Sequence, residues 1–299
     1  MEIRSNRWLY VVLVAFVLGS CQADDIFVRY VNQKVPLPCE LRPMTCTDQQ
    51  VAPVQMDRVL VIAAHPDDIE TSAGGTVARL VQAGVEVRYV LVTNGDRGTQ
   101  NRSMTPAELA VIRQLEQIRA AKVLGVESVD FLDVEDGNVR NTLCLQRNLT
   151  RLIRMYKPNA IFTWNPSLER HQDLYLHGFQ HSDHRTTGLA VLDVVYPKIR
   201  DFLYFPELLK EGYQPWKVKE VYLFNWSVDP EDPASLFQVD ISNTFEAKMK
   251  SLMQHESQIS NATELRITML HMGRNLAMAT SPKPTQFMFA EWFKRVLFM

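Results

Sequence analysis

Apolar runs alternate with amphipathic stretches along most of this 299-residue chain. The runs at residues 59–64 and 85–93 have the length and apolar character of buried strands. Between them, apolar positions recur at helical spacing over residues 69–83, and Gly84 ends the pattern. This order predicts a strand, a helix and a second strand joined as a βαβ unit.

The next helix has a clear start signal in the sequence. Thr105, Pro106 and Glu108 have the spacing of an N-cap, a first helical residue and a capping-box partner, and Gly125 is its expected stop. Further along, the same alternation predicts strands at 129–132, 160–163, 218–225 and 236–241, and helices at 142–156, 244–256, 264–279 and 287–298. The aromatic residues of the last segment are expected on the core face of a closing helix.

Strands that alternate with helices imply a sheet whose strands run mostly parallel. We therefore expect an α/β fold with a doubly wound, Rossmann-like sheet in a single domain, residues 56–299. The hydrophobic content of 46% is sufficient for such a core. Residues 24–55 carry prolines and cysteines without lasting periodicity, so they are predicted to be an N-terminal extension that lies on the domain.

The first 23 residues have the outline of a signal peptide. Arg4 and Arg7 precede an apolar run at residues 8–18, and small and polar residues follow it. This run is shorter than the roughly 20 apolar residues of a membrane span. The stretch that ends at Cys21 resembles a bacterial lipoprotein box, whereas residues 21–23 suit an ordinary signal peptidase. We expect an exported protein, either soluble or lipid-anchored through Cys21, with no transmembrane helix once this segment is removed.

Cysteines and glycosylation motifs bear on the same compartment. Cys39 and Cys46 are close enough in sequence for a small disulfide loop, which would leave Cys144 unpaired. The chain also has N-x-S/T motifs, which favour a eukaryotic secretory route, although such short motifs also occur by chance. They begin at Asn101, Asn148, Asn225 and Asn261.

The overall charge limits the class of partner. The formal net charge is −2, so there is no excess of positive charge to neutralise the phosphates of a nucleic acid or an anionic membrane surface. A small, roughly neutral substrate is the better expectation.

Two polar motifs follow predicted strands of the sheet, where open α/β sheets bind their ligands. Residues 65–70 read His-Pro-Asp-Asp-Ile-Glu, and residues 181–185 read His-Ser-Asp-His-Arg. His65 and Asp68 are three positions apart across a strand-to-helix turn, so their side chains can converge while the carboxylate between them is directed elsewhere. His184, which opens a predicted helix that runs to Tyr196, is a reasonable third ligand.

Two histidines and one carboxylate form the ligand set of a catalytic metal site. Zinc is the default for this set, although iron(II) uses it too. Each motif also has a simpler interpretation, the first as a capped helix start and the second as a solvated polar loop. Because both motifs follow strands of one predicted sheet, a shared site is the better explanation.

These motifs resemble the LmbE-like (PIG-L) N-acetylglucosamine deacetylases. The resemblance extends in order over roughly residues 59–296. Besides the two motifs, it rests on Gly74-Gly75-Thr76, residues 93–99, Arg113, Glu116, Leu124-Gly125, Asp136-Gly137, Lys248, residues 255–258 and residues 290–293. It departs at Ser182, where the family commonly has proline.

The resemblance implies a zinc-dependent hydrolase, with one zinc held by His65, Asp68 and His184. The expected substrate is a small molecule or glycan that contains an N-acetylglucosamine unit, and the products are acetate and a free amine. Two alternatives remain open, namely an amidase for another N-acyl sugar conjugate and an inactive glycan-binding descendant. The retained Asp67 argues against the second, since a protein without turnover has no need of a base.

The resemblance also implies three catalytic roles. Asp67 would be the general base, and His181 would stabilise the oxyanion and protonate the leaving amine, with Asp183 orienting that imidazole. Amide hydrolysis needs each of these functions, because a water must be deprotonated, a negative oxygen must be stabilised and an amine must leave.

Other polar residues have two interpretations each. His171 and His177 could form the pocket rim or could be solvated loop residues. Arg97 and Arg113 could bind sugar hydroxyls or could be surface charges. His255 matches the family, but on a late predicted helix it could equally be a surface residue.

Overall fold

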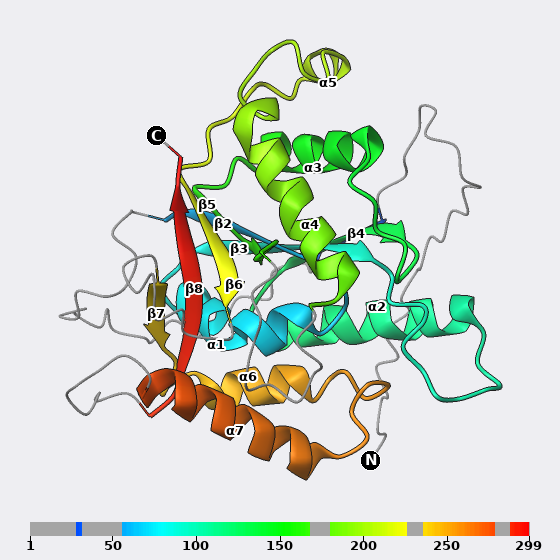
Figure 1. Cartoon of the computed structure of the whole chain (residues 1–299), viewed down its shortest axis with the longest axis vertical. Coiled ribbons are helices and arrows are strands. Elements are labelled where there is room, and N and C mark those ends of the chain that lie inside the picture. The colour runs from blue at the N-terminus through cyan, green and yellow to red at the C-terminus, as the bar shows by residue number, and fades with distance from the viewer. Residues whose placement is uncertain (1–27, 32–55, 168–179, 226–235, 279–287, 299) are drawn as a thin grey trace, which may run out of the picture.

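The computed structural model describes residues 28–31, 56–167, 180–225, 236–278 and 288–298, and shows one eight-stranded sheet with helices on both faces (Figure 1). The strands are β1 (Val28–Val31), β2 (Arg58–Ala63), β3 (Glu86–Thr93), β4 (Ser128–Val134), β5 (Ala160–Trp164), β6 (Glu220–Asn225), β7 (Leu236–Asp240) and β8 (Ala290–Leu297). The helices are α1 (Asp68–Gln82), α2 (Pro106–Val123), α3 (Leu143–Tyr156), α4 (Ser182–Asp193), the π-helical turn η1 (Val194–Lys198), α5 (Glu207–Lys210), α6 (Phe245–Leu252) and α7 (Ala262–Met278).

The strand order is β1-β4-β3-β2-β5-β6-β8-β7, and the five strands from β4 to β6 are parallel. From β2 the chain proceeds outward through β3 and β4, then returns to the other side of β2 with β5 and continues to β6. The order therefore reverses between β2 and β5, which is where doubly wound sheets bind ligands. The predicted α/β, mostly parallel, doubly wound sheet is confirmed.

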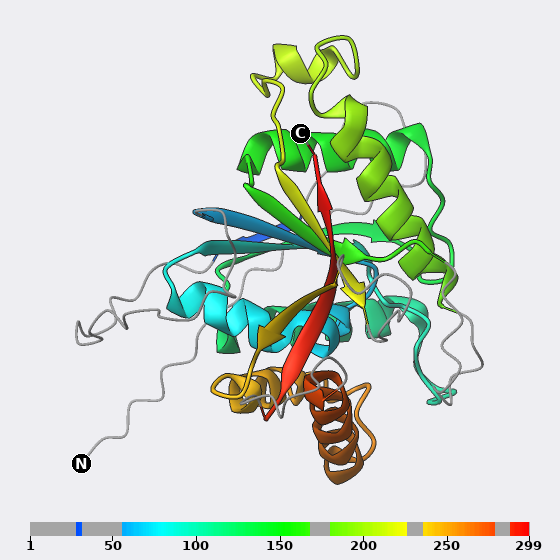
Figure 2. The same cartoon turned by 60° about the vertical axis from the view of Figure 1, so that its left-hand side comes forward.

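Alternate residues of β2 supply two separate hydrophobic cores. Val59, Val61 and Ala63 pack on the face covered by α1, α2, α6 and α7, whereas Leu60 and Ile62 pack against α3 and α4. The period of two between opposite faces of a strand produces this division. Figures 1 and 2 show α1 lying between the sheet and α6.

The predicted signals for helix ends are present in the structure. Thr105 caps α2 through a complete capping box with Glu108. Gly84 and Gly125 follow α1 and α2 with φ of 83° and 81°, values that only glycine adopts at little cost.

One predicted helix was wrong. Residues 287–298 were expected to close the domain as a helix, but Ala290–Leu297 is strand β8, antiparallel to both β6 and β7. Four successive residues, Ala290 to Phe293, are all buried, so both faces of the strand are covered at this end. A strand buried on both faces shows no polar alternation, so its pattern resembles that of a buried helix.

The N-terminal extension also differs from expectation. Val28–Val31 forms the edge strand β1, antiparallel to β4, so part of the extension belongs to the sheet.

Cys144 is disulfide-bonded, and the expectation that it is the unpaired cysteine was wrong. The predicted signal peptide and the Cys39–Cys46 pairing lie outside the described residues. Within the described ranges, no helix is long and apolar enough to cross a membrane.

Candidate metal and active site

The three predicted metal ligands meet at the switch point of the sheet. His65 lies two residues after the end of β2, Asp68 begins α1, and His184 lies in the first turn of α4. His65 Nδ1 is 3.1 Å from His184 Nε2 and 3.5 Å from Asp68 Oδ2, and His184 Nε2 is 3.2 Å from Asp68 Oδ1. Tetrahedral ligands about 2.1 Å from zinc are separated by roughly 3.4 Å. This donor set therefore fits a single metal ion.

Hydrogen bonds fix the orientation of the Asp68 carboxylate. Its Oδ2 accepts hydrogen bonds from the backbone N–H groups of Ala64 and His65, at 3.1 and 2.8 Å, and from the indole N–H of Trp164 at 3.0 Å. The other carboxylate oxygen, Oδ1, faces His184. Burial alone would raise the pKa of Asp68, but His184 and His65 hold it well below its ordinary value. The group is therefore an anion, as a ligand must be.

Trp164 also orients the histidine ligand from α4. Its indole stacks on the His184 imidazole with ring centroids 3.7 Å apart and an angle of 7° between the planes. The close packing depends on Gly188, because a Cβ atom there would lie 2.1 Å from the Trp164 carbonyl oxygen. Sequence reasoning missed Trp164, although its position at the carboxyl end of β5 was a usable signal.

The second nitrogen of His65 faces two carboxylates. Nε2 is 3.1 Å from Asp136 Oδ1 and 3.2 Å from Asp183 Oδ2. Buried Asp183 also accepts the backbone N–H groups of Gly137 and Val139. A metal-ligating histidine usually donates its other N–H to such a carboxylate. The carboxylate of Asp183 thus orients His65, whereas His181 was the predicted partner.

The electrostatics of this cluster have a consequence for metal binding. Burial lowers the pKa of His65, but Asp68, Asp136 and Asp183 outweigh burial and raise it to about 12. The doubly protonated imidazolium form of His65 is therefore favoured in the absence of metal, and an incoming ion must displace one of its two protons. Besides the predicted set, two other groups in the described part of the chain have donor atoms close enough to share a metal ion; both include His65 and neither includes Asp68. They are His65 with His181 and His184, and His65 with Asp136 and Asp183.

His181 is exposed at the rim of the cluster, where it caps α4. Its ring lies 4.6 Å from that of His65, and its Nδ1 accepts the backbone N–H of Asp183 at 3.2 Å. Because that bond occupies Nδ1, the neutral ring carries its proton on Nε2. Burial and the neighbouring His65 and His184 lower the pKa of His181. The ring is therefore a neutral hydrogen-bond donor near pH 7 in the metal-free site.

Asp67 occupies an unusual backbone conformation beside the ligands. Its φ is 98°, in the left-handed region, and its carboxylate is 3.0 Å from Arg113 Nη2. Burial raises the pKa of Asp67, and the Arg113 guanidinium only partly opposes this. The pKa values of the neighbouring Asp67 and Asp68 are thus shifted in opposite directions. Such a difference distinguishes a proton acceptor from a carboxylate that stays ionised.

Arg113 is neither a surface charge nor free to bind sugar. It is buried beneath the turn and donates to the carbonyl oxygens of Pro66 and Gly95 as well as to Asp67. Arg97, by contrast, is exposed and pairs with Glu135 at 3.0 Å. The predicted rim residues His171 and His177 lie outside the described residues.

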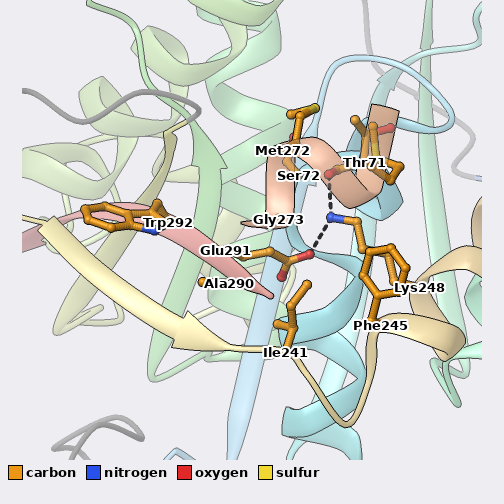
Figure 3. A pocket seen from close by; sticks show the side chains of 11 residues that line it. Thr71, Ser72, Ile241, Phe245, Lys248, Met272, Gly273, Ala290, Glu291 and Trp292 are labelled. Atoms are coloured by element: carbon orange, nitrogen blue, oxygen red, sulfur yellow. Dashed lines mark hydrogen bonds and ion pairs between the residues drawn. The ribbon is translucent and has the colours of Figure 1, made fainter. Parts of the chain in front are cut away.

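A buried ion pair between α6 and β8 contacts α1, as Figure 3 shows. Lys248 Nζ is 2.6 Å from Glu291 Oε1 and donates to the carbonyl oxygen of Thr71. Glu291 accepts the backbone N–H groups of Gly75 and Thr76. Strand β8 and helix α6 therefore hold the helix whose N-terminus carries the site.

A family model and two relatives that match this chain point to the same protein family. A PIG-L family model, described as GlcNAc-PI de-N-acetylase, matches residues 60–195. Diacetylchitobiose deacetylase of Thermococcus kodakarensis is 30% identical over 205 residues, which cover 67% of this chain and 70% of that protein. A 1D-myo-inositol 2-acetamido-2-deoxy-alpha-D-glucopyranoside deacetylase of Mycobacterium sp. is 27% identical over 275 residues, covering 79% of this chain and 80% of that one.

A solved structure supports the same relationship. N,N'-diacetylchitobiose deacetylase of Pyrococcus horikoshii has a TM-score of 0.68 and 27% identity, over 81% of this chain and 85% of that one. The predicted motifs, the fold and these similarities agree. The chain belongs to the PIG-L family, the LmbE-like deacetylases.

Proposed function

We propose that this protein is a metal-dependent N-deacetylase that removes the acetyl group from an N-acetylglucosamine-containing substrate. The observation that carries the proposal is the convergence of His65, Asp68 and His184 beside Asp67, a carboxylate of raised pKa. The names of the relatives support the substrate class, since they include deacetylases of diacetylchitobiose and of an acetamido-deoxyglucopyranoside of inositol.

We assign the metal as zinc, held by His65, Asp68 and His184, with iron(II) as the alternative for the same ligands. A metal ion held by these three side chains would supply Lewis-acid chemistry, lowering the pKa of a coordinated water to about 7 and polarising the amide carbonyl. The low pKa of Asp68 supports its assignment as the anionic ligand.

Asp67 acts as the general base, because its raised pKa brings a carboxylate closer to the pKa range in which proton acceptance is effective. Its contact with Arg113 keeps the carboxylate in place. His181 presents an Nε2–H donor at the exposed rim, where it stabilises the developing oxyanion. Because a neutral imidazole whose Nδ1 accepts a backbone N–H does not give up its remaining proton near pH 7, the proton for the leaving nitrogen is the one that Asp67 takes from water, in place of the delivery expected of His181. Asp183 supports His181 through its backbone N–H and His65 through its carboxylate.

Substitutions separate the ligands from the base. Asp67→Asn should retain about one metal ion per chain while turnover falls by at least about 10²-fold, the usual scale for a general base. Asp68→Ala and His184→Ala should instead lose metal, because each deletes a ligand. Metal content by elemental analysis, measured beside turnover, checks both. If Asp67→Asn loses metal and Asp68→Ala keeps it, the two carboxylates are assigned the wrong way round.

A further inference from the structure

The strained turn at Asp67 is connected to a chain of buried polar side chains that the roles above do not use. The backbone N–H of Asp67 donates to Gln117 Oε1 at 3.0 Å. Gln117 Nε2 in turn donates to Glu70 Oε1 at 2.9 Å, and Glu70 Oε2 is 3.3 Å from His255 Nε2. Gln117, Glu70 and His255 are all fully buried.

These contacts join three parts of the chain that are distant in sequence. Glu70 lies in α1, Gln117 in α2 and His255 just after α6. His255 is held near α2 because the neighbouring Ser257 donates its backbone N–H and its hydroxyl to Glu116, at 2.7 Å each. Burial lowers the pKa of His255, but Glu70 outweighs burial and raises it, which favours an ion pair at the far end of the chain.

A residue with a side chain is held at positive φ only when its surroundings fix it there. Asp67 does not cap α1 with its own side chain. Within the described residues, its backbone is fixed instead by Gln117 on its N–H and by the bond from Thr71 N–H to its carbonyl oxygen. Since Gln117 has both of its amide atoms bonded, it cannot rotate to release this turn unless Glu70 also moves.

Resting on the proposed function, we propose that Gln117, Glu70 and His255 are positioning residues, which hold the backbone of Asp67 so that its carboxylate points to the reacting water. None of the three contacts the metal ligands through its side chain. The interpretation of His255 as a surface residue is therefore replaced by a role inside the protein.

The test compares Gln117→Met with Gln146→Met. Gln146 is a buried glutamine on α3 whose Nε2 donates to Asn141, so this control removes a similar amide on the opposite face of the sheet from α2. Gln117→Met should keep one metal ion per chain and an unchanged KM while kcat falls about 10-fold or more, because a small displacement of a reacting group is costly. Gln146→Met should keep its kcat, whatever its loss of thermal stability.

Glu70 supplies a rescue experiment. Glu70→Gln can still accept from Gln117 and donate to a neutral His255, so its kcat should stay within about 3-fold of the parent. Glu70→Met can neither accept nor donate these hydrogen bonds, so its kcat should fall as far as that of Gln117→Met while its metal is retained. Near-UV circular dichroism checks that each variant folds. His255→Leu, at the far end of the chain of contacts, replaces any variant that does not fold. This variant should retain its metal and show a lowered kcat.

Each outcome has a separate meaning. If Asp67→Asn is inactive while Gln117→Met and His255→Leu turn over like Gln146→Met, the positioning role is overturned and the proposed function stands. If Asp67→Asn is fully active, the assignment of the base is itself wrong. A loss of metal from Gln117→Met would also contradict the inference, because it would place the effect on the ligands.

Discussion

At the residue scale, Asp67 and Asp68 show how position divides two identical side chains into different roles. Asp68 is surrounded by donors and has a lowered pKa, whereas Asp67 is paired with one arginine and has a raised pKa. The sequence motif predicted that they point in different directions, and the left-handed φ of Asp67 explains how adjacent residues do so.

The strain at Asp67 can be measured through stability. Asp67→Gly and Asp67→Ala both lose the contact with Arg113, so they differ only in backbone preference. Because φ is 98°, the glycine variant should be the more stable by about 1–2 kcal/mol. At exposed Arg119, inside α2, the same pair should show the reverse order by about 1 kcal/mol. Chemical denaturation measures both differences, and an alanine variant at 67 that equals or exceeds the glycine variant would contradict the strain.

Some site residues could be predicted from sequence and others could not. His65, Asp68 and His184 belong to motifs with short spacing, and the fold brings them together. Trp164 lies 96 residues from Asp68, its hydrogen-bond partner, and Gln117 lies 50 residues from Asp67. Such pairs leave no local periodicity, so only the three-dimensional arrangement shows them.

The hydrogen bond from Trp164 should matter for metal affinity more than for stability. Trp164→Phe keeps an aromatic ring against His184 but loses the N–H bond to Asp68, so metal affinity should fall by about 10- to 100-fold. Trp216→Phe loses a comparable bond, from its indole to the Pro158 carbonyl, away from the site. Competition titration with a chelating dye compares the two. Equal affinities in both variants would refute the positioning of the ligand by Trp164.

At the scale of elements, the close approach of α4 to β5 sets the geometry of the site. Sequence patterns predicted both elements, but not the distance between them, because it depends on the absence of a side chain at Gly188. The missed strand β8 has a related cause. Its buried residues have partners in β6 and β7 that no local pattern records.

Gly188→Ala tests the packing of these two elements. The added Cβ would lie 2.1 Å from a backbone oxygen, so α4 must move away from β5 and carry His184 with it. We expect at least about a 10-fold loss of metal affinity and a loss of stability of about 1–3 kcal/mol. Leu189→Ala, on the exposed side of α4, should leave metal affinity unchanged. Calorimetric metal titration would contradict the account if both variants bind equally well.

At the scale of the whole molecule, the alternation of strands and helices was enough to predict the mostly parallel, doubly wound sheet, but not the point at which its strand order reverses. The order of the antiparallel strands at its edges was not predictable, because β1, β7 and β8 are joined to the sheet by contacts distant in sequence. Export is a separate question, which rests on the N-terminal pattern of the sequence.

We propose that the chain is exported with its first 20 to 23 residues removed. If it passes through a eukaryotic secretory route, Asn101 should carry glycan because it lies exposed in a turn. Asn148 should not, since it lies within α3 and its Oδ1 is buried. Mass spectrometry of the native protein decides both points, and an intact Met1 on a cytosolic protein would refute export.

The most direct test of the central claim is the release of acetate and free amine from a panel of N-acetylglucosamine conjugates, with N,N'-diacetylchitobiose among them and other N-acyl sugars as competitors. We predict equal amounts of acetate and amine from at least one N-acetylglucosamine conjugate, loss of this release after chelation, and its return when zinc is restored to one ion per chain. Silence across the panel with metal bound at His65, Asp68 and His184 would contradict the proposed function, and faster release from another N-acyl sugar would replace the substrate class.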